Sequence, residues 1–429
     1  MRKLRYFLSA LLLISTLLSA QSETVLYKRL KSFSDIVQIT PVKHDTTFAE
    51  AYELMITQPV DHNKPDGAKF KQKVYLSHRD DSSPVVFVTE GYAAPGNRPA
   101  ELTRILQANQ IIVEHRYFGK SVPDKIDWEY LTIRQSANDH HALVQLFKNI
   151  YSGKWISTGI SKGGQTTLFF KRFYPNDVDV SVPYVAPINL AAEDPRIYMF
   201  LNSVGTEDCR NKIIQFQRAF LEKRAEIINL LMKDVEKKNL RLAWDYDFVL
   251  EYMTLEYSFA FWQWGNTKCD DIPSADSPAE KLYEHMVKAN PLYFFTEQAM
   301  KDFGPFYVQA YNEIGYYGYD LEPFKDLLTQ IKDGSNILLV PEGVKVNFDC
   351  RVMNDVNNWL QKKGKNIIYI YGGNDTWSAT SIQLLGETNS VKMVKQGGAH
   401  GTRIASFNGE QKEKIYSTLE AWLGIQIRR

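Results

Sequence analysis

Short apolar runs alternate with helical patterns through residues 34–190. Residues 85–88 (Val-Val-Phe-Val) and 110–113 (Gln-Ile-Ile-Val) are nearly continuous apolar runs, which are typical of strands buried on both faces of a sheet. Residues 132–148 begin with the spacing of a capping box and continue as a helix, and residues 154–158 form the next predicted strand. This alternation of strands and helices indicates a parallel α/β sheet.

The pattern changes between residues 191 and 333. Residues 212–237 have the periodicity of a long amphipathic helix, and residues 252–264 are crowded with aromatic side chains. This stretch contains no run typical of a buried strand, so we predict a mostly helical insertion. Alternation then returns in residues 334–429, with predicted strands at 337–340, 366–371 and 391–394 and predicted helices over 350–360 and 409–423.

These patterns predict an α/β protein with a cap. The mostly parallel sheet of the core is built from residues 34–190 and 334–429, and residues 191–333 form a helical cap inserted between the two halves. The chain has 429 residues, which suits one large domain with an insertion.

The first 20 residues predict export. Three basic residues (Arg2, Lys3 and Arg5) precede an apolar run at 6–18, and the small residues Ser-Ala follow, as in a cleaved signal peptide. The run is shorter than the roughly 20 residues of a transmembrane helix, although an uncleaved anchor is the alternative. No cysteine follows it, which argues against a lipoprotein. We expect a periplasmic or extracellular protein with no stable membrane insertion after cleavage.

The charge balance excludes some classes of partner. The chain has 51 Lys+Arg and 50 Asp+Glu, and removal of the three bases in residues 1–20 would leave 48 bases against 50 acids. A near-neutral chain has no strong electrostatic attraction to nucleic acid or to an anionic membrane. Three cysteines are too few for a disulfide scaffold or a zinc site made of cysteines. The oligomeric state is not evident from the sequence.

The cysteines allow one disulfide. Cys209 and Cys269 flank helical segments of the predicted cap, and an oxidising compartment would permit a bond between them, with Cys350 left free. The alternative is three free thiols, because the sequence does not give the distance between the two residues.

The main chemical signal is Gly-Ile-Ser-Lys-Gly at residues 159–163. In a nucleophile elbow, the serine lies at a sharp turn between a strand and a helix, and small neighbours allow the backbone to form the turn. Here an apolar strand precedes Ser161, and a helix is predicted from about Gly164. We therefore predict that Ser161 is a nucleophile, with an ordinary turn serine as the alternative.

A base and an acid follow in the order that this topology requires. Asp375 comes after the predicted strand 366–371, and His400, flanked by glycines, comes after the strand 391–394. In this hypothesis Ser161 attacks a carbonyl, His400 takes and returns the proton, and Asp375 holds the imidazole tautomer. Each of the three is thus predicted on a loop after a strand.

The oxyanion hole of such a site combines two backbone N–H groups. One follows the nucleophile and belongs to Lys162, and the other comes from the loop after an early strand, at Gly91 or Tyr92. A simple tight turn is the alternative for that loop. We predict neither a metal nor a cofactor, because the chain has no HExxH motif, no Cys/His cluster and no phosphate-binding glycine motif.

The residues around Ser161 resemble a known family. Residues 159–167 (Gly-Ile-Ser-Lys-Gly-Gly-Gln-Thr-Thr), followed by 184–189, resemble the secreted bacterial prolyl tripeptidyl aminopeptidases. Four further segments resemble the related lysosomal Pro-X carboxypeptidase and dipeptidyl peptidase II group: residues 58–62, 114–119, 374–377 and 398–400. The resemblance implies a serine peptidase with an α/β-hydrolase core, a helical cap and a preference for proline on the acyl side of the scissile bond. Arg403 stands where the lysosomal relatives often carry an acid, which leaves the finer specificity open.

An aminopeptidase must bind the substrate's free α-ammonium, which in a dry cleft requires a carboxylate. Glu313 is the first candidate, because residues 307–319 resemble a substrate-facing segment of the lysosomal relatives, and Glu90 is the second. Either could instead be a solvated or structurally paired acid. Trp377 and the aromatic residues Phe261, Trp262 and Trp264 could line a proline-sized pocket or belong to the core.

The sequence therefore predicts a secreted serine exopeptidase that releases short N-terminal fragments, tripeptides by resemblance, from proline-containing peptides. An esterase or lipase shares the fold and the triad, and a preference for acyl esters over peptides would distinguish it. A non-catalytic exported binding protein is a third possibility, although such decay should remove a triad residue and none is missing.

Overall fold

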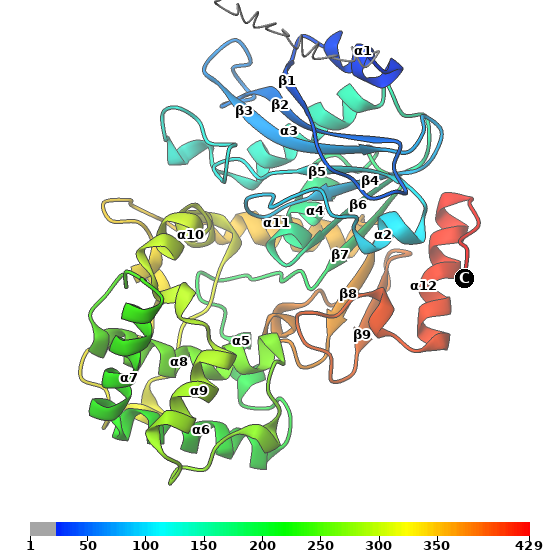
Figure 1. The fold of residues 1–429 in the computed structure, drawn as a ribbon. Coiled ribbons are helices and arrows are strands. Elements are labelled where there is room, and N and C mark those ends of the chain that lie inside the picture. Colours follow the sequence, from blue (N-terminus) through cyan, green and yellow to red (C-terminus); the bar gives the residue numbers. More distant parts are fainter. Residues whose placement is uncertain (1–22) are drawn as a thin grey trace, which may run out of the picture.

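A computed structural model describes residues 23–429, so the predicted signal peptide, 1–20, lies outside the described residues. Nine strands form one sheet in the order β1-β2-β3-β5-β4-β6-β7-β8-β9 (Figure 1). The strands β1, β2, β3 and β5 pair antiparallel, and the pairs from β5 to β9 are parallel. The strands are β1 Ile36–Pro41, β2 Glu50–Pro59, β3 Lys69–His78, β4 Val85–Thr89, β5 Asn109–Val113, β6 Trp155–Ile160, β7 Val180–Tyr184, β8 Ile368–Gly372 and β9 Val391–Lys395.

Helices cover both faces of the parallel strands because alternate apolar residues point to opposite faces. Val85 and Phe87 of β4 pack in a cluster with Val144 of α3, whereas Val86 packs with Leu102 of α2. The helices of the core are α1 Val25–Lys31, α2 Glu101–Ile105, α3 Ile133–Phe147, α4 Lys162–Phe173, α11 Cys350–Lys362 and α12 Gly409–Leu423.

A helical layer is inserted between β7 and β8, and Figure 1 shows it gathered to one side of the sheet. The core strand β7 ends at Tyr184 and β8 begins at Ile368. The fold class predicted from the sequence, an α/β-hydrolase core with a helical cap, is confirmed. The helices of this layer are α5 Arg196–Leu201, α6 Glu207–Glu222, α7 Arg224–Lys237, α8 Tyr246–Trp264, α9 Ala279–Ala289 and α10 Glu297–Gln309.

Two sequence predictions are wrong in detail. Residues 336–339 form a 3-10 helix rather than a strand, with Ile337 and Leu338 partly exposed, and β7 pairs directly with β8. The single helix predicted at 212–237 is two helices, α6 and α7, because the backbone leaves helical geometry at Lys223 (φ −90°, ψ 26°).

The cap contains a disulfide. Cys209 at the start of α6 is bonded to Cys269, five residues after α8 ends, and Cys350 is free and exposed, so the predicted pairing is confirmed. Within residues 23–429, no helix combines the length and apolarity that crossing a bilayer requires.

Candidate active site

The parallel strands bring the predicted site residues to one edge of the sheet. Ser161 follows β6, Asp375 follows β8 and His400 follows β9. Because the carboxyl ends of parallel strands meet at the same edge, loops far apart in the sequence come together there. Ser161 and His400 line a common cavity of about 610 Å³.

Ser161 occupies a strained turn between β6 and α4. Its φ of 57° and ψ of −123° are unusual for a residue with a side chain. The flanking glycines make the turn possible, because a Cβ on Gly159 would lie 2.2 Å from the carbonyl oxygen of Gly163. A Cβ on Gly163 would lie 2.6 Å from the carbonyl oxygen of Thr89. This backbone is that of a nucleophile elbow.

Asp375 and His400 are in direct contact. His400 Nδ1 lies 2.8 Å from Asp375 Oδ2, and both side chains are buried. The backbone N–H of Trp377 donates to Asp375 Oδ1 over 3.2 Å, which orients the carboxylate. A carboxylate on Nδ1 leaves Nε2 as the nitrogen available to accept a proton.

The cap helix α8 holds both of these loops. The backbone N–H of His400 donates to the carbonyl oxygen of Gln263 over 2.8 Å. The hydroxyl of Thr376 donates to the carbonyl oxygen of Phe259 over 3.0 Å, and the Trp264 ring packs edge-on against His400. The cap therefore positions the two loops as well as covering them.

The loop after β4 lies directly against the elbow. A Cβ on Gly91 would lie 2.6 Å from Cβ of Lys162 and 2.7 Å from the amide nitrogen of Gly163, so only glycine allows this approach. Within residues 23–429, the backbone N–H groups of Gly91 and Tyr92 donate no hydrogen bond. Both are therefore available to an oxyanion bound beside the N–H of Lys162.

The side chain of Lys162 is buried, which sequence reasoning missed. Its ammonium nitrogen donates to the carbonyl oxygen of Gly91 over 2.7 Å and lies 5.5 Å and 5.1 Å from the ring centroids of Tyr92 and Phe118. Burial places the pKa of Lys162 well below its usual value. The side chain thus ties the elbow to the loop after β4.

Aromatic rings make up much of the cavity wall. Trp377 and Trp264 line it, as the sequence suggested, whereas Phe261 and Trp262 do not. Trp377 packs against Tyr317, with ring centroids 5.4 Å apart. The other aromatic residues of the wall are Tyr92, Tyr252, Phe294, Phe295, Phe303, Phe306, Tyr307, Tyr316 and Tyr319.

Two carboxyl groups face this cavity. Glu90, from the loop after β4, has no hydrogen-bond or ion-pair partner within residues 23–429, and burial beside Glu114 raises its pKa to about 7. Glu256, on α8, accepts hydrogen bonds from the hydroxyls of Tyr317 (2.9 Å) and Tyr319 (2.6 Å). Burial raises the pKa of Glu256 to about 7 as well.

Glu313, the first candidate for the substrate ammonium, does not line this cavity. Its carboxylate accepts the backbone N–H of Ile133 over 2.7 Å and so caps the first turn of α3. A carboxylate is favourable there because the first N–H groups of a helix lack intrahelical partners. Sequence reasoning missed Glu256, for which the only signal was an acid within the aromatic stretch 252–264.

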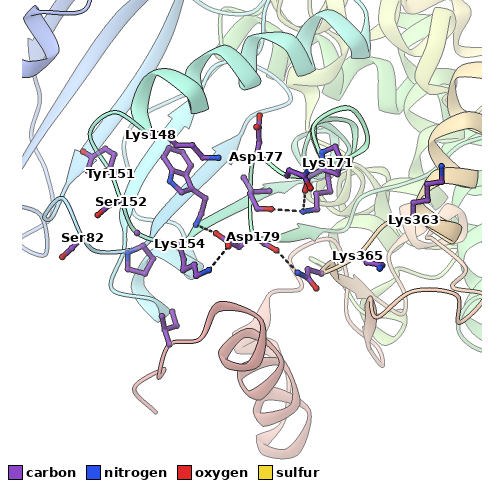
Figure 2. Close-up of a pocket in the computed structure, with 18 of the residues that line it drawn as sticks. Ser82, Lys148, Tyr151, Ser152, Lys154, Lys171, Asp177, Asp179, Lys363 and Lys365 are labelled. Carbon is purple, nitrogen blue, oxygen red and sulfur yellow. Dashed lines mark hydrogen bonds and ion pairs between the residues drawn. The ribbon is translucent and has the colours of Figure 1, made fainter.

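A larger cavity lies at the other end of the sheet. It has a volume of about 930 Å³, and Pro84, Lys154 and Asp179, which line it, precede β4, β6 and β7. Figure 2 shows its lysines: Lys154 pairs with Asp179 over 3.0 Å, and Lys171 donates to the carbonyl oxygens of Pro175 and Val178. None of the predicted site residues lines it.

The described part of the chain offers no cluster of three or more His, Cys, Asp or Glu side chains that could hold a metal ion. The chemistry available in the cavity with Ser161 is that of a serine, a histidine, two carboxyls and the guanidinium of Arg403, with the backbone N–H groups of Gly91 and Tyr92 beside the elbow.

Comparison with known proteins gives the family. The chain is 32% identical over 376 residues to the prolyl tri/tetrapeptidyl aminopeptidase of Streptomyces mobaraensis. The matched region covers 86% of this chain and 79% of that protein. It is 26% identical over 207 residues to prolyl carboxy peptidase like protein 5 of Caenorhabditis elegans (42% and 41%). Among solved structures, acetyl xylan esterase 1 from Thermoanaerobacterium sp. JW/SL YS485 is similar with a TM-score of 0.39, 13% identity and coverage of 92% and 91%. The profile of the PS-10 peptidase S37 family matches residues 25–428, so the chain belongs to this family and is a serine peptidase.

Proposed function

We propose that the protein is a secreted exopeptidase that releases short N-terminal fragments, tripeptides in the main, and cleaves after proline through Ser161, His400 and Asp375. The observation that carries this proposal is the His400–Asp375 contact of 2.8 Å beside a cavity lined by the strained Ser161 and by two carboxyls that have no ionic partner within residues 23–429.

The reaction proceeds through an acyl-enzyme. Ser161 Oγ attacks the scissile carbonyl carbon while Nε2 of His400 takes its proton, and Asp375 stabilises the imidazolium. The N–H groups of Lys162 and of Gly91 or Tyr92 bind the oxyanion. His400 then gives the proton to the leaving amine, and a water molecule activated by His400 hydrolyses the ester in the same way.

The cavity wall supports the preference for proline. The proline side chain is an apolar ring, and rings such as those of Trp377 and Trp264 bind it through apolar surface without requiring a hydrogen bond. The name of the Streptomyces relative, a prolyl tri/tetrapeptidyl aminopeptidase, also supports proline as the residue on the acyl side.

The two carboxyls support recognition of a free amino terminus. The α-ammonium of a peptide loses its hydration in a closed cavity and requires a carboxylate partner. Glu90 and Glu256 both lack a cationic partner within the described residues. Export is supported by the apolar segment 6–18 and by the disulfide of the cap.

Labelling and cleavage together test this function. A fluorophosphonate should label the wild type and leave Ser161→Ala unlabelled, and Ala-Ala-Pro-anilide should be cleaved faster than its N-acetylated form. Labelling that survives Ser161→Ala would place the nucleophile elsewhere. Faster cleavage of acyl esters than of any peptide would indicate the esterase alternative, and a folded wild type that is neither labelled nor active would indicate a binding protein.

A further inference from the structure

The cap helix α8 spans the cavity beside the proposed triad. Gln263, which accepts the backbone N–H of His400, and Glu256 are seven residues apart on this helix, and both line the cavity. Seven residues are close to two full turns, so the two lie on one face of the helix about 10 Å apart along its axis. An extended tripeptide also spans about 10 Å.

Tyrosines close the cavity around Glu256. The hydroxyls of Tyr317 and Tyr319 both donate to its carboxylate, and the Tyr317 ring stacks on Phe259 with centroids 3.8 Å apart. Tyr317 also packs against Trp377, two residues after Asp375. A continuous aromatic wall thus connects the proposed triad with Glu256.

A third and smaller cavity lies behind the same wall. It has a volume of about 180 Å³, and Tyr317 and Tyr319 line both this cavity and the one that contains Ser161. Glu256 lines only the cavity with Ser161. The two tyrosine side chains therefore separate the cavity with Ser161 from a space that a longer peptide could occupy.

We propose that Glu256, held by Tyr317 and Tyr319, binds the α-ammonium of the substrate and sets the released fragment at three residues, with Tyr319 as the wall that excludes longer fragments. This inference rests on the proposed function and adds to it the residue that determines the length of the released fragment.

Glu90 is in the wrong place for this role. It directly precedes Gly91 in the loop that contributes the proposed oxyanion hole, so an ammonium bound there would lie beside the scissile carbonyl. Glu256 comes from the cap, two helical turns from the residue that holds His400. Only Glu256 leaves room for three residues between the ammonium and the scissile bond.

The test is a series of anilides that end in proline, with two to five residues before the scissile bond, each with a free and an acetylated amino terminus. For the wild type, kcat/KM of the free peptides should be highest at three residues. Glu256→Gln should lower kcat/KM for the free three-residue peptide roughly ten- to a hundred-fold and change the acetylated peptide little, because a charge-assisted hydrogen bond is lost.

The tyrosine variants test the wall. Tyr319→Ala should raise kcat/KM of the four- and five-residue peptides relative to the three-residue peptide by opening the cavity into the space behind it. Tyr319→Phe keeps the ring and should keep the maximum at three. Glu313→Gln makes the same chemical change as Glu256→Gln outside the cavity, and it should leave the length profile unchanged.

The outcomes separate this inference from the proposed function. If Glu256→Gln retains the wild-type length profile and the wild-type ratio of free to acetylated cleavage, the inference is wrong, and so it is if folded Tyr319→Ala cleaves the longer peptides no better, relative to the three-residue peptide, than the wild type does. If Tyr319→Ala does not fold, Glu256→Gln decides alone. A wild type that is labelled and cleaves peptides of every length equally overturns only the length inference, whereas one that cleaves no peptide overturns the proposed function.

Discussion

The core and the cap contribute to the same cavity in different ways. The core contributes Ser161 and His400 to the cavity, with Asp375 buried against His400, and each of the three loops follows a strand and carries glycines or a turn that the sequence displays. The cap contributes Glu256 from the face of a helix and Tyr317 and Tyr319 from an irregular segment. Residues placed by a local turn are therefore visible in the sequence, whereas residues placed by the meeting of two distant segments are not.

Hydrogen bonds nevertheless connect the two regions. Helix α8 accepts hydrogen bonds from the loop of Asp375, through Thr376, and from the loop of His400, and it also carries Glu256. Movement of α8 would therefore shift the loops of Asp375 and His400 together with Glu256. The following changes separate the two contributions, from the largest expected effect to the smallest.

Asp375→Asn should give the largest loss, because an amide cannot hold the correct imidazole tautomer of His400. We expect kcat to fall about 10⁴-fold for free and acetylated peptides alike, with an unchanged circular dichroism spectrum. Equal kcat values for the variant and the wild type would remove Asp375 from the triad. A fall in kcat for free peptides alone would mean that Asp375, a core residue, acts in recognition of the amino terminus, which is the role proposed for the cap.

Removal of the disulfide should weaken the cap more than the core. The bond joins residues separated by 60 positions, and Cys209→Ser with Cys269→Ser should lower the free energy of unfolding by about 2–4 kcal/mol, because the unfolded chain gains entropy. Chemical denaturation with and without a reductant measures this change. Cys350→Ser is the matched control and should have no effect. An unfolding midpoint insensitive to reductant would contradict the prediction.

The pH dependence should differ between free and acetylated peptides. Burial raises the pKa of Glu256 to about 7, so the group is protonated below pH 7 and cannot pair with an ammonium. The ratio of kcat/KM for the free peptide to that for the acetylated one should rise more than tenfold from pH 5.5 to pH 7.5, and it should fall above about pH 8, where the α-amine loses its proton.

The charged and titratable surroundings of Glu256 simplify this experiment. Five buried tyrosines in the described structure interact electrostatically with Glu256. Their pKa values lie well above the usual value, so they remain neutral throughout this pH range: Tyr252, Tyr307, Tyr316, Tyr317 and Tyr319. Glu256→Gln should make the ratio independent of pH below pH 7.5. A ratio that still rises in this variant would assign the titration to Glu90, whose pKa is also raised to about 7.

Thr376→Val should give the smallest effect, since it removes one neutral hydrogen bond to the carbonyl oxygen of Phe259. A net loss of about 1 kcal/mol corresponds to a roughly fivefold lower kcat, with KM and the ratio of free to acetylated cleavage unchanged. Thr380→Val is the matched control, because Thr380 bonds only the nearby carbonyl oxygen of Trp377 through its hydroxyl. Equal effects of the two variants would mean that contact with α8 does not position the loop of Asp375.

The sequence by itself determined five of the nine strands in residues 23–429 and the order of the triad candidates, whereas β1, β2, β3 and β7 were not predicted. The apolar runs at 85–88, 110–113, 154–158, 366–371 and 391–394 coincide with β4, β5, β6, β8 and β9. Strands β4, β5, β6 and β8 are buried along nearly their whole length, and such burial favours a nearly continuous apolar signal, whereas β9 is half-buried and carries Lys392 and Lys395. The elbow leaves one as well, because only glycine tolerates the contacts at positions 159 and 163.

Only the tertiary structure decided which acid faces the cavity with Ser161 and which apolar runs become strands. Glu313 and Glu256 look alike in the sequence, yet one caps α3 and the other lies in the cavity, because the path of residues 310–319 across the cap selects their neighbours. The apolar run 337–340 does not enter the sheet, because β7 and β8 pair directly with each other. Such outcomes depend on contacts between residues far apart in the chain, which local composition does not encode.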